Sequence, residues 1–158
     1  MKNSIINPTI ATLVYCTFDN KVLLAKRNKA PFVGHWVAPG GKVELGESPH
    51  NCAIRELCEE TDLIAKNAIL RGVITEKAPR TDWHWLIFAY VVTEFDGKIT
   101  KEHREGELQW WNVNEFDQVK MPEADVIFID KLLDVDSPIY QATFSYDSDI
   151  KLITCIEH

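Results

Sequence analysis

Four acidic residues crowd into the segment "RELCEETD", which runs from Arg55 to Asp62. On a helix, Glu56 lies one turn from both Glu59 and Glu60, and like charges at these spacings each cost roughly a few tenths of a kcal/mol. Glu59 and Glu60 also fall in the C-terminal half, where the helix dipole disfavours negative charge. Arg55 stands four residues before Glu59 and can neutralise one of these charges, but not all three. The segment therefore requires either solvent or a cation around it.

Divalent cations explain this cluster well. Mg²⁺ and Mn²⁺ prefer oxygen ligands, usually a few carboxylates together with water and substrate phosphates. Gly40 and Gly41 stand just before the segment in "PGGKVELGE", and paired glycines let the backbone approach a ligand so that a carbonyl can reach a metal. A solvated acidic helix face and a plain turn are the alternative explanations. The residues predict a Mg²⁺ site, with Mn²⁺ as a second choice.

A helix must position these acids, and the local signals predict one over residues 49–61. Ser48 is a good N-cap and Pro49 suits the first helical position. At 100° per residue, one face should be buried and the opposite face should carry the charges. The expected buried face holds Ala53, Ile54, Leu57, Cys58 and Thr61, and the other holds Cys52, Arg55, Glu56, Glu59 and Glu60.

The rest of the chain reads as strands and one further helix, without repeats or linkers. β-Branched and aromatic runs predict strands, and turn residues separate them. The pattern predicts α+β architecture, with a mixed sheet and helices packed on it. The expected strands are 9–18, 21–27, a short extended piece at 42–44, 68–76, 85–95, "ELQWWNV", and a closing hairpin of "IYQATFSY" and "IKLITCIE"; a turn at Asp96-Gly97 leads into "KIT", Asn114 caps a short turn, and a helix spans 123–134.

Taken together, "GGKVELGE" and "RELCEETDL" resemble the Nudix box of MutT-like nucleotide hydrolases. Gly41, Glu47, Arg55, Glu56, Leu57, Glu59, Glu60 and Leu63 match the pattern. Asp62 stands where the family usually has glycine, at a position that ends the helix in a left-handed conformation. Aspartate tolerates this conformation, so the change reads as structural. Similarity to the MutT branch extends over nearly the whole chain, including "GHWVAPGGKVE", the Trp110-Trp111 strand and "MPEADVIFIDKLL".

This resemblance implies a fold and a reaction. The fold would be the Nudix α/β/α sandwich, as a single domain over residues 1–158. The reaction would be metal-assisted cleavage of a nucleoside triphosphate to a nucleoside monophosphate and pyrophosphate, with 8-oxo-dGTP as the expected substrate. Other nucleoside diphosphate derivatives, such as ADP-ribose, dinucleotides or nucleotide sugars, are the alternative, and a non-catalytic nucleotide-binding module is a further one.

The resemblance also implies residue roles. Glu56, Glu59, Glu60 and the Gly40 carbonyl would hold the metal, and Glu47 would orient Arg55, which aligns the glutamates. Glu105, in "KEHREGELQWW", would be a further metal ligand, unless it belongs to a solvated charged loop. The general base would be a box glutamate, Glu59 or Glu56, or Glu105. The residues expected to contact substrate are Thr12, Arg27, Gly41, Lys42, Met121, Glu123 and Asp125.

Base recognition follows less directly from the resemblance. Met121 stands where the best-known members have an aromatic residue, and Ala124 separates two acids that are adjacent there. Phe32 or Trp36 could stack on a base, with core packing as the alternative. The tryptophans of "WHW", Trp83 and Trp85, are expected in the core, with a place beside the base pocket as the alternative.

Composition limits the class of partner. The 158 residues carry a net charge of −7 and a pI of about 5.2, so no basic patch suits a nucleic-acid polymer. The four cysteines form no CxxC pair and no zinc spacing, no run approaches a membrane span, and a reduced cytoplasmic protein is expected. A small nucleotide is the expected partner, and the oligomeric state, monomer or homodimer, stays open.

Overall fold

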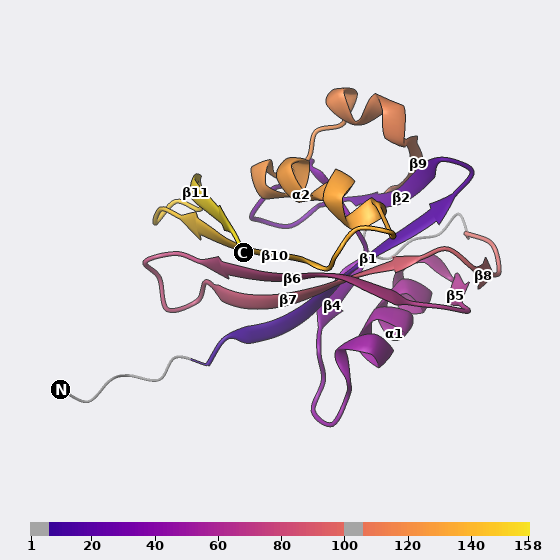
Figure 1. Ribbon diagram of the computed structural model, residues 1–158, viewed down its shortest axis with the longest axis horizontal. Helices are drawn as coiled ribbons and strands as arrows, with labels where there is room; N and C mark the ends of the chain where they lie inside the picture. Colours follow the sequence, from indigo (N-terminus) through magenta and orange to yellow (C-terminus); the bar gives the residue numbers. More distant parts are fainter. Residues whose placement is uncertain (1–6, 100–105) are drawn as a thin grey trace.

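Strand β1 (Thr9–Phe18) organises the sheet, because it pairs along both of its edges. One edge runs parallel to β7 (His84–Val92) from Thr9 to Cys16. The other edge pairs antiparallel with β4 (Gly40–Lys42), and then with β2 (Lys21–Lys26) at Thr17 and Phe18. The computed structural model describes residues 7–99 and 106–158, and Figure 1 shows how these elements cross.

The remaining strands extend the sheet on either side of β1. The order is β11-β10-β6-β7-β1-β2-β3, with β9 added to β2. Parallel pairing joins β1 to β7 and β6 to β10, whereas the other pairs in this sheet are antiparallel. The mixed sheet predicted from the pattern is therefore confirmed. These strands are β3 (Trp36–Val37), β6 (Ile69–Lys77), β9 (Leu108–Asn112), β10 (Tyr140–Tyr146) and β11 (Leu152–Glu157).

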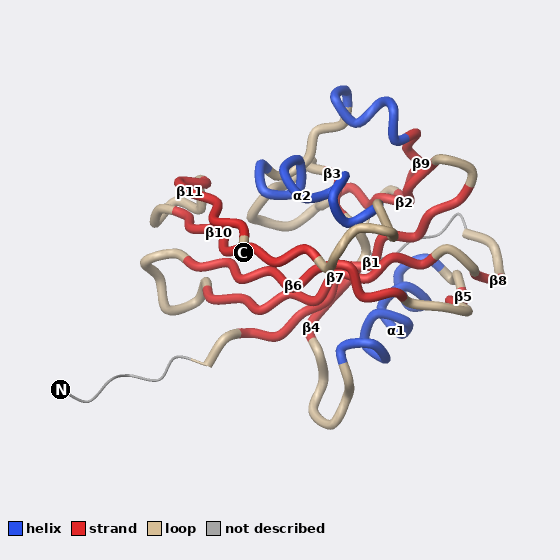
Figure 2. Tube along the Cα trace, viewed as in Figure 1, coloured by secondary structure: helices blue, strands red, loops and turns tan. Residues whose placement is uncertain are grey.

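Two helices cover opposite faces of the sheet (Figures 1 and 2). Helix α1 (Pro49–Thr61) packs Ala53 and Leu57 against Val14 and Cys16 of β1. Helix α2 (Glu123–Leu133) packs on the other face, in the cluster that contains Tyr15. Successive side chains of a strand point to opposite faces, so β1 contributes to both cores. This arrangement is the expected α/β/α sandwich.

The helical face predicted for α1 was rotated from the true one. Cys52, expected among the charges, is fully buried, while Cys58, expected inside, is exposed. The reason is the position of β4, which runs beside the helix and covers Cys52: its thiol donates to the Gly41 and Lys42 carbonyls at 3.7 and 3.5 Å. The helical wheel predicts how wide the buried face of the helix is, but packing against β4 decides which residues lie on it.

Three local predictions were also wrong. The short strand expected at 42–44 is β4 at Gly40–Lys42, because Gly41 pairs with Thr12. The 96–97 turn forms no hairpin with the described residues after it; β8 (Phe95–Asp96) pairs instead with β5 (Ile64–Ala65). The short turn is a 3₁₀ helix, η1 (Val113–Gln118), and its cap is the Asn112 side chain, which accepts from the Asn114 N–H at 2.9 Å.

Candidate functional site

Helix α1 begins and ends where local chemistry requires. The Ser48 hydroxyl accepts from the Asn51 N–H at 3.1 Å, and Pro49 occupies the first turn. At the other end Asp62 adopts φ 63° and ψ 8°, and its N–H donates to the Cys58 carbonyl. The left-handed conformation expected of Asp62 is thus confirmed. These two caps set the length of the helix that carries the acids.

Arg55 joins the acids of α1 to the loop before it. Its Nε donates to Glu47 Oε1 at 2.7 Å and its Nη2 to Oε2 at 3.0 Å, a bidentate pair. Its Nη1 donates to Glu56 at 2.9 Å and to Glu59 at 3.2 Å. The hydrogen bond from Arg55 lowers the pKa of Glu47 to about 2, so this pair stays ionised at neutral pH. One guanidinium group therefore positions two helix glutamates relative to Glu47.

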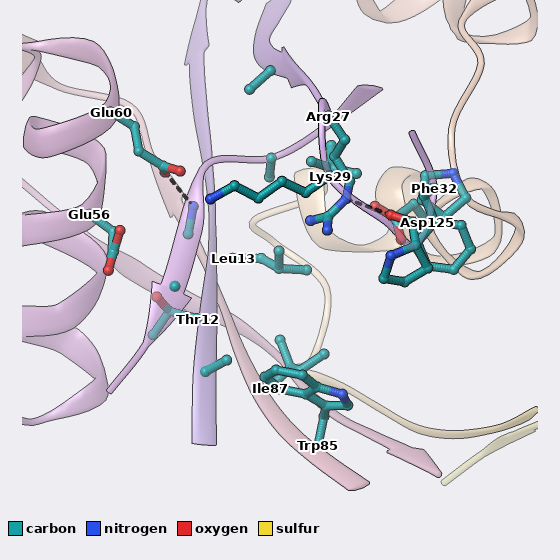
Figure 3. Close-up of a pocket in the computed structure, with 18 of the residues that line it drawn as sticks. Thr12, Leu13, Arg27, Lys29, Phe32, Glu56, Glu60, Trp85, Ile87 and Asp125 are labelled. Atoms are coloured by element: carbon teal, nitrogen blue, oxygen red, sulfur yellow. Dashed lines mark hydrogen bonds between the residues drawn. The ribbon is translucent and has the colours of Figure 1, made fainter. Parts of the chain in front are cut away.

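Strand β4 lies against the same glutamates. The Gly40 N–H donates to Glu60 Oε2 at 2.7 Å, the dashed line beside Glu60 in Figure 3. A Cβ atom on Gly41 would lie 2.3 Å from Glu56 Oε1, so a larger residue would displace this carboxylate. Glu59 differs from these two, since its side chain is 60% exposed and no described contact joins it to β4. The helix therefore brings Glu56 and Glu60, rather than all three acids, to β4.

The donor set suits a hard cation. Within residues 7–99 and 106–158, no three carboxylate, imidazole or thiolate side chains converge on one point that could hold a metal ion. Glu56, Glu60 and the backbone of Gly40 nevertheless lie together, and Mg²⁺ commonly takes one or two carboxylates while water and substrate phosphates complete its shell. The missing Cβ at Gly41 also keeps space beside the Glu56 carboxylate. These residues fit a magnesium ion that a phosphate ligand completes.

A cavity of about 700 Å³ opens beside these acids. Glu56 and Glu60 lie at one end, and Arg27, Phe32 and Asp125 lie at the other (Figure 3). Thr12 and Leu13 of β1 lie between the two ends, and Lys29 extends toward Glu60. The volume of the cavity is within the range of small-molecule binding sites.

The far end of the cavity combines aromatic rings with buried acids. Trp83 and Trp85 pack edge to face at 5.8 Å between ring centroids, and Trp83 packs on Tyr146 at 6.2 Å. The Tyr146 hydroxyl donates to Glu76 Oε1 at 3.1 Å. Burial raises the pKa of Glu76 to about 7 and raises the pKa of Asp125 well above its ordinary value. This end therefore takes up protons at neutral pH.

A family model described as the NUDIX domain matches residues 7–133. The chain belongs to the Nudix family. The geometry agrees with this, since the Nudix box of this chain forms the loop, helix and acidic cavity end described above.

Relatives of this Nudix protein carry several names. It is 35% identical over 139 residues to an uncharacterized Nudix hydrolase, YvcI, of Bacillus subtilis, covering 86% of this chain and 85% of that one. It is 29% identical to an ADP-ribose pyrophosphatase of Methanocaldococcus jannaschii, covering 77% and 72%, and 33% identical to an 8-oxo-dGTP diphosphatase of Proteus vulgaris, covering 59% and 82%. The crystal structure of a MutT protein from Bacillus halodurans superposes with a TM-score of 0.83 at 31% identity, covering 94% and 97%.

The Nudix cavity gathers most of the residues predicted from sequence. The predicted residues that line it are Thr12, Arg27, Gly40, Gly41, Lys42, Glu56, Glu60 and Asp125. Arg27 is held by the loop after β2, because its Nε donates to the Pro31 carbonyl at 2.8 Å. Lys42 lies over the Trp85 ring, 5.8 Å from its centroid.

Other predicted residues of this Nudix chain lie elsewhere. Met121 is buried in the core on the α2 side, and Glu123 is exposed at the start of α2; neither lines the cavity. Trp36 is also a core residue, packed on Trp111 at 5.3 Å, whereas Phe32 lines the cavity. Glu105 lies outside the described residues.

Sequence reasoning missed Glu76 and Tyr146, and it favoured the core over the pocket for Trp83 and Trp85, which pack on the core and also border the cavity. All four line the cavity. The available signal was weak: Glu76 is a charged residue near the end of an apolar strand, where charged side chains are commonly exposed to solvent.

No helix in the described part of the chain is long and apolar enough to cross a membrane.

Proposed function

We propose that this protein is a magnesium-dependent nucleoside triphosphate diphosphatase of MutT type, which converts an oxidised purine nucleotide such as 8-oxo-dGTP to the monophosphate and pyrophosphate. The observation that carries the proposal is a single cavity whose two ends differ in chemistry. One end has the acids and glycines of the Nudix box, and the other has aromatic rings and protonatable acids. A nucleotide has the same division into polyphosphate and base.

At the phosphate end, Glu56, Glu60 and the Gly40 carbonyl would hold Mg²⁺, or Mn²⁺ in its place, and Glu59 and Glu105 are further candidate ligands. When bound, such an ion screens the phosphate charge and lowers the pKa of a nearby water. Arg55 keeps Glu56 and Glu59 in place through its pair with Glu47. Without a cation, the net charge of −7 would oppose phosphate binding.

Cationic side chains support the same orientation. Lys29 extends toward Glu60 (Figure 3), so it can reach a phosphate held there. Lys42 lines the same cavity. Glu59, Glu56 or Glu105 would take the proton of the attacking water. Base contact is proposed for Phe32 and Asp125; Thr12 is buried and donates to or accepts from the Cys52 thiol at 3.4 Å, so its contact with substrate is through packing.

A substrate panel tests this proposal. Purified protein is given 8-oxo-dGTP, the four ordinary deoxynucleoside triphosphates, ADP-ribose, a dinucleotide and a nucleotide sugar, each with Mg²⁺, with Mn²⁺ and with a chelator. Chromatography then identifies the products. Monophosphate and pyrophosphate from a triphosphate support the proposal, with 8-oxo-dGTP having the highest kcat/KM. Release of orthophosphate, or equal rates with chelator, contradicts it.

ADP-ribose hydrolysis is the second candidate. The relative from Methanocaldococcus jannaschii bears that name over 77% of this chain, and the cavity volume also admits a nucleoside with a second sugar. AMP and ribose 5-phosphate as the favoured products would establish it. Tight binding without any hydrolysis would instead indicate a nucleotide-binding module.

A further inference from the structure

Four polar side chains from four elements meet at the end of the cavity away from Glu56. Glu76 comes from β6 and Tyr146 from the parallel strand β10, and the tyrosine hydroxyl donates to the carboxylate at 3.1 Å. Asp125 comes from the first turn of α2 and Tyr15 from β1. Burial raises the pKa of Tyr15 well above its ordinary value, and the charges of Asp125 and Glu76 raise it further. Glu76, Asp125 and Tyr146 line the cavity.

The cluster is incompletely hydrogen-bonded among the residues that the structure describes. The Tyr15 hydroxyl is fully buried and has no partner there. Asp125 is only 9% exposed, and its carboxyl group accepts a hydrogen bond from its own backbone. A buried polar group without a partner costs roughly 1–3 kcal/mol. Tyr15 does not line the cavity, so a ligand there would donate to Glu76 and Asp125, which do.

The chemistry of the cluster selects the kind of ligand. The proposed function assigns the polyphosphate to the Glu56–Glu60 end, so this end, where Arg27 also lies, is left for the base. Burial favours the protonated forms of the two carboxyl groups, so the pair still offers acceptor oxygens while carrying less than two charges. Trp85 and Phe32 border the same space and suit a flat ring. A heterocycle with adjacent N–H donors meets these requirements.

We propose that Glu76 is a specificity-determining residue: together with Asp125 it forms a two-carboxyl subsite for a purine edge that carries a ring N–H beside an exocyclic amine. This inference rests on the proposed function, because it assumes that the phosphates occupy the Glu56–Glu60 end. The sequence already indicated Asp125, on α2, for substrate contact. The new residue is Glu76, on β6. Guanine and 8-oxoguanine share this edge, whereas hypoxanthine lacks the amine.

Several charged or titratable groups face Glu76 and influence its protonation. Desolvation is the main effect, and the Tyr146 hydroxyl opposes it. Glu76 in turn raises the pKa values of Tyr15, Asp125 and Tyr146. The surrounding groups are Tyr15 on β1, Tyr146 on β10, Asp125 and Glu123 on α2, Arg27 after β2, and Lys42 over Trp85 on β7.

A one-donor difference between substrates tests the inference. kcat/KM is measured for dGTP and dITP, which have the same phosphates and sugar and differ in the exocyclic amine. The wild-type protein should prefer dGTP by roughly tenfold to a hundredfold, the value of a hydrogen bond to a charged or buried acceptor. Glu76→Gln, whose amide presents a donor as well as an acceptor, should bring the ratio within threefold by lowering kcat/KM for dGTP more than for dITP. A wild-type ratio near one, or an unchanged ratio in Glu76→Gln, overturns the inference.

Two further measurements keep the outcome decisive. Glu94→Gln, an exposed acid at the end of β7, is the matched control and should keep the wild-type ratio. If Glu76→Gln does not fold, Tyr146→Phe replaces it. Loss of the hydroxyl should shift the pH at which KM for dGTP changes to a higher value and leave the corresponding pH for dITP in place. An unshifted transition for dGTP overturns the inference. If the wild-type protein hydrolyses neither these two nucleotides nor 8-oxo-dGTP, the proposed function fails, and calorimetry of dGMP and dIMP without metal then decides on the subsite, with equal affinities counting against it.

Discussion

Gly41 and Glu56 are so close that a Cβ atom at position 41 would lie 2.3 Å from Oε1 of the glutamate. The contact joins β4 to α1 and keeps the Glu56 carboxylate at the cavity, where Arg55 also holds it at 2.9 Å. The obstacle to a larger residue is the end of a side chain, which can move. Gly41 pairs with Thr12 in the sheet, so the strand itself has less freedom.

Gly41→Ala should therefore displace Glu56 more than it disturbs the fold. We expect kcat to fall at least tenfold in the presence of Mg²⁺, because a misplacement of about 1 Å at a catalytic group can cost a hundredfold. The melting temperature should change by only a few degrees. Gly46→Ala is the control, since no atom lies within 4 Å of its added methyl group although its φ of +79° makes alanine strained. Equal activity of Gly41→Ala and wild type would contradict the assigned role.

Arg55→Lys should reduce activity although the positive charge remains. Lysine cannot make the bidentate pair with Glu47 and also reach Glu56 and Glu59. We expect kcat to fall roughly tenfold to a hundredfold, the usual effect of losing a group that orients metal-binding residues. Steady-state kinetics at saturating Mg²⁺ measures this, and the concentration of Mg²⁺ at half-maximal rate should rise. Arg80→Lys, in an exposed pair with Asp82, should behave as wild type.

Magnesium should raise the melting temperature of the protein, and Glu60→Gln should weaken this effect. A ligand that binds only the folded state stabilises it by mass action, by about 2.7 kcal/mol at one hundred times its Kd. Glu60 is held by the Gly40 N–H at 2.7 Å, so the glutamine should keep this contact and the fold. Thermal scans over a series of Mg²⁺ concentrations provide a readout that needs no substrate. Identical shifts in wild type and variant would remove Glu60 from the metal site.

Local signals predicted α1 well because they act over a few residues. Ser48, Pro49 and Asp62 each contribute a backbone preference or a cap that needs no distant partner. The mixed sheet and the box likewise follow from patterns in contiguous segments. Cys52 shows where this reasoning ends, since its burial depends on β4 and the thiol contacts with that strand.

Glu76 could not be predicted for a related reason. Its environment is made by Asp125, 49 positions later in the chain, and by Tyr146, 70 positions later. The alternation of β6 gives the face on which a side chain lies, but not what covers that face. Met121 shows the opposite case: the family resemblance implied that it contacts the substrate, whereas its side chain is buried in the core.

Arg71→Met should destabilise the protein strongly. Arg71 is 3% exposed and donates to the backbone carbonyls of Leu132, Asp134 and Ser137, at 3.2, 2.5 and 2.8 Å, and also to that of Pro138. Methionine fills the space but leaves these carbonyls at the end of α2 without donors, at a cost of about 3 kcal/mol or more. Urea unfolding measures the change. Arg80→Met, at an exposed position, should leave the midpoint almost unchanged, and similar losses in both variants would contradict the argument.

Replacing Glu76 by glutamine should flatten the pH dependence of stability between about pH 4.5 and 7. Burial raises the pKa of Glu76 from an ordinary 4.5 to about 7, so within this window the folded protein keeps a proton that the unfolded chain has released. The free energy of unfolding must then fall as pH rises, by at most on the order of 3 kcal/mol, and level off above pH 7. Asp125 adds a slope of the same sign, because its pKa is raised as well, chiefly by desolvation and then by Glu76. Urea unfolding at half-unit steps from pH 5 to 8 should show a smaller slope for Glu76→Gln than for wild type, and Glu94→Gln should run parallel to wild type. A slope unchanged by Glu76→Gln would mean that the carboxyl group ionises in the folded protein as it does in the unfolded chain.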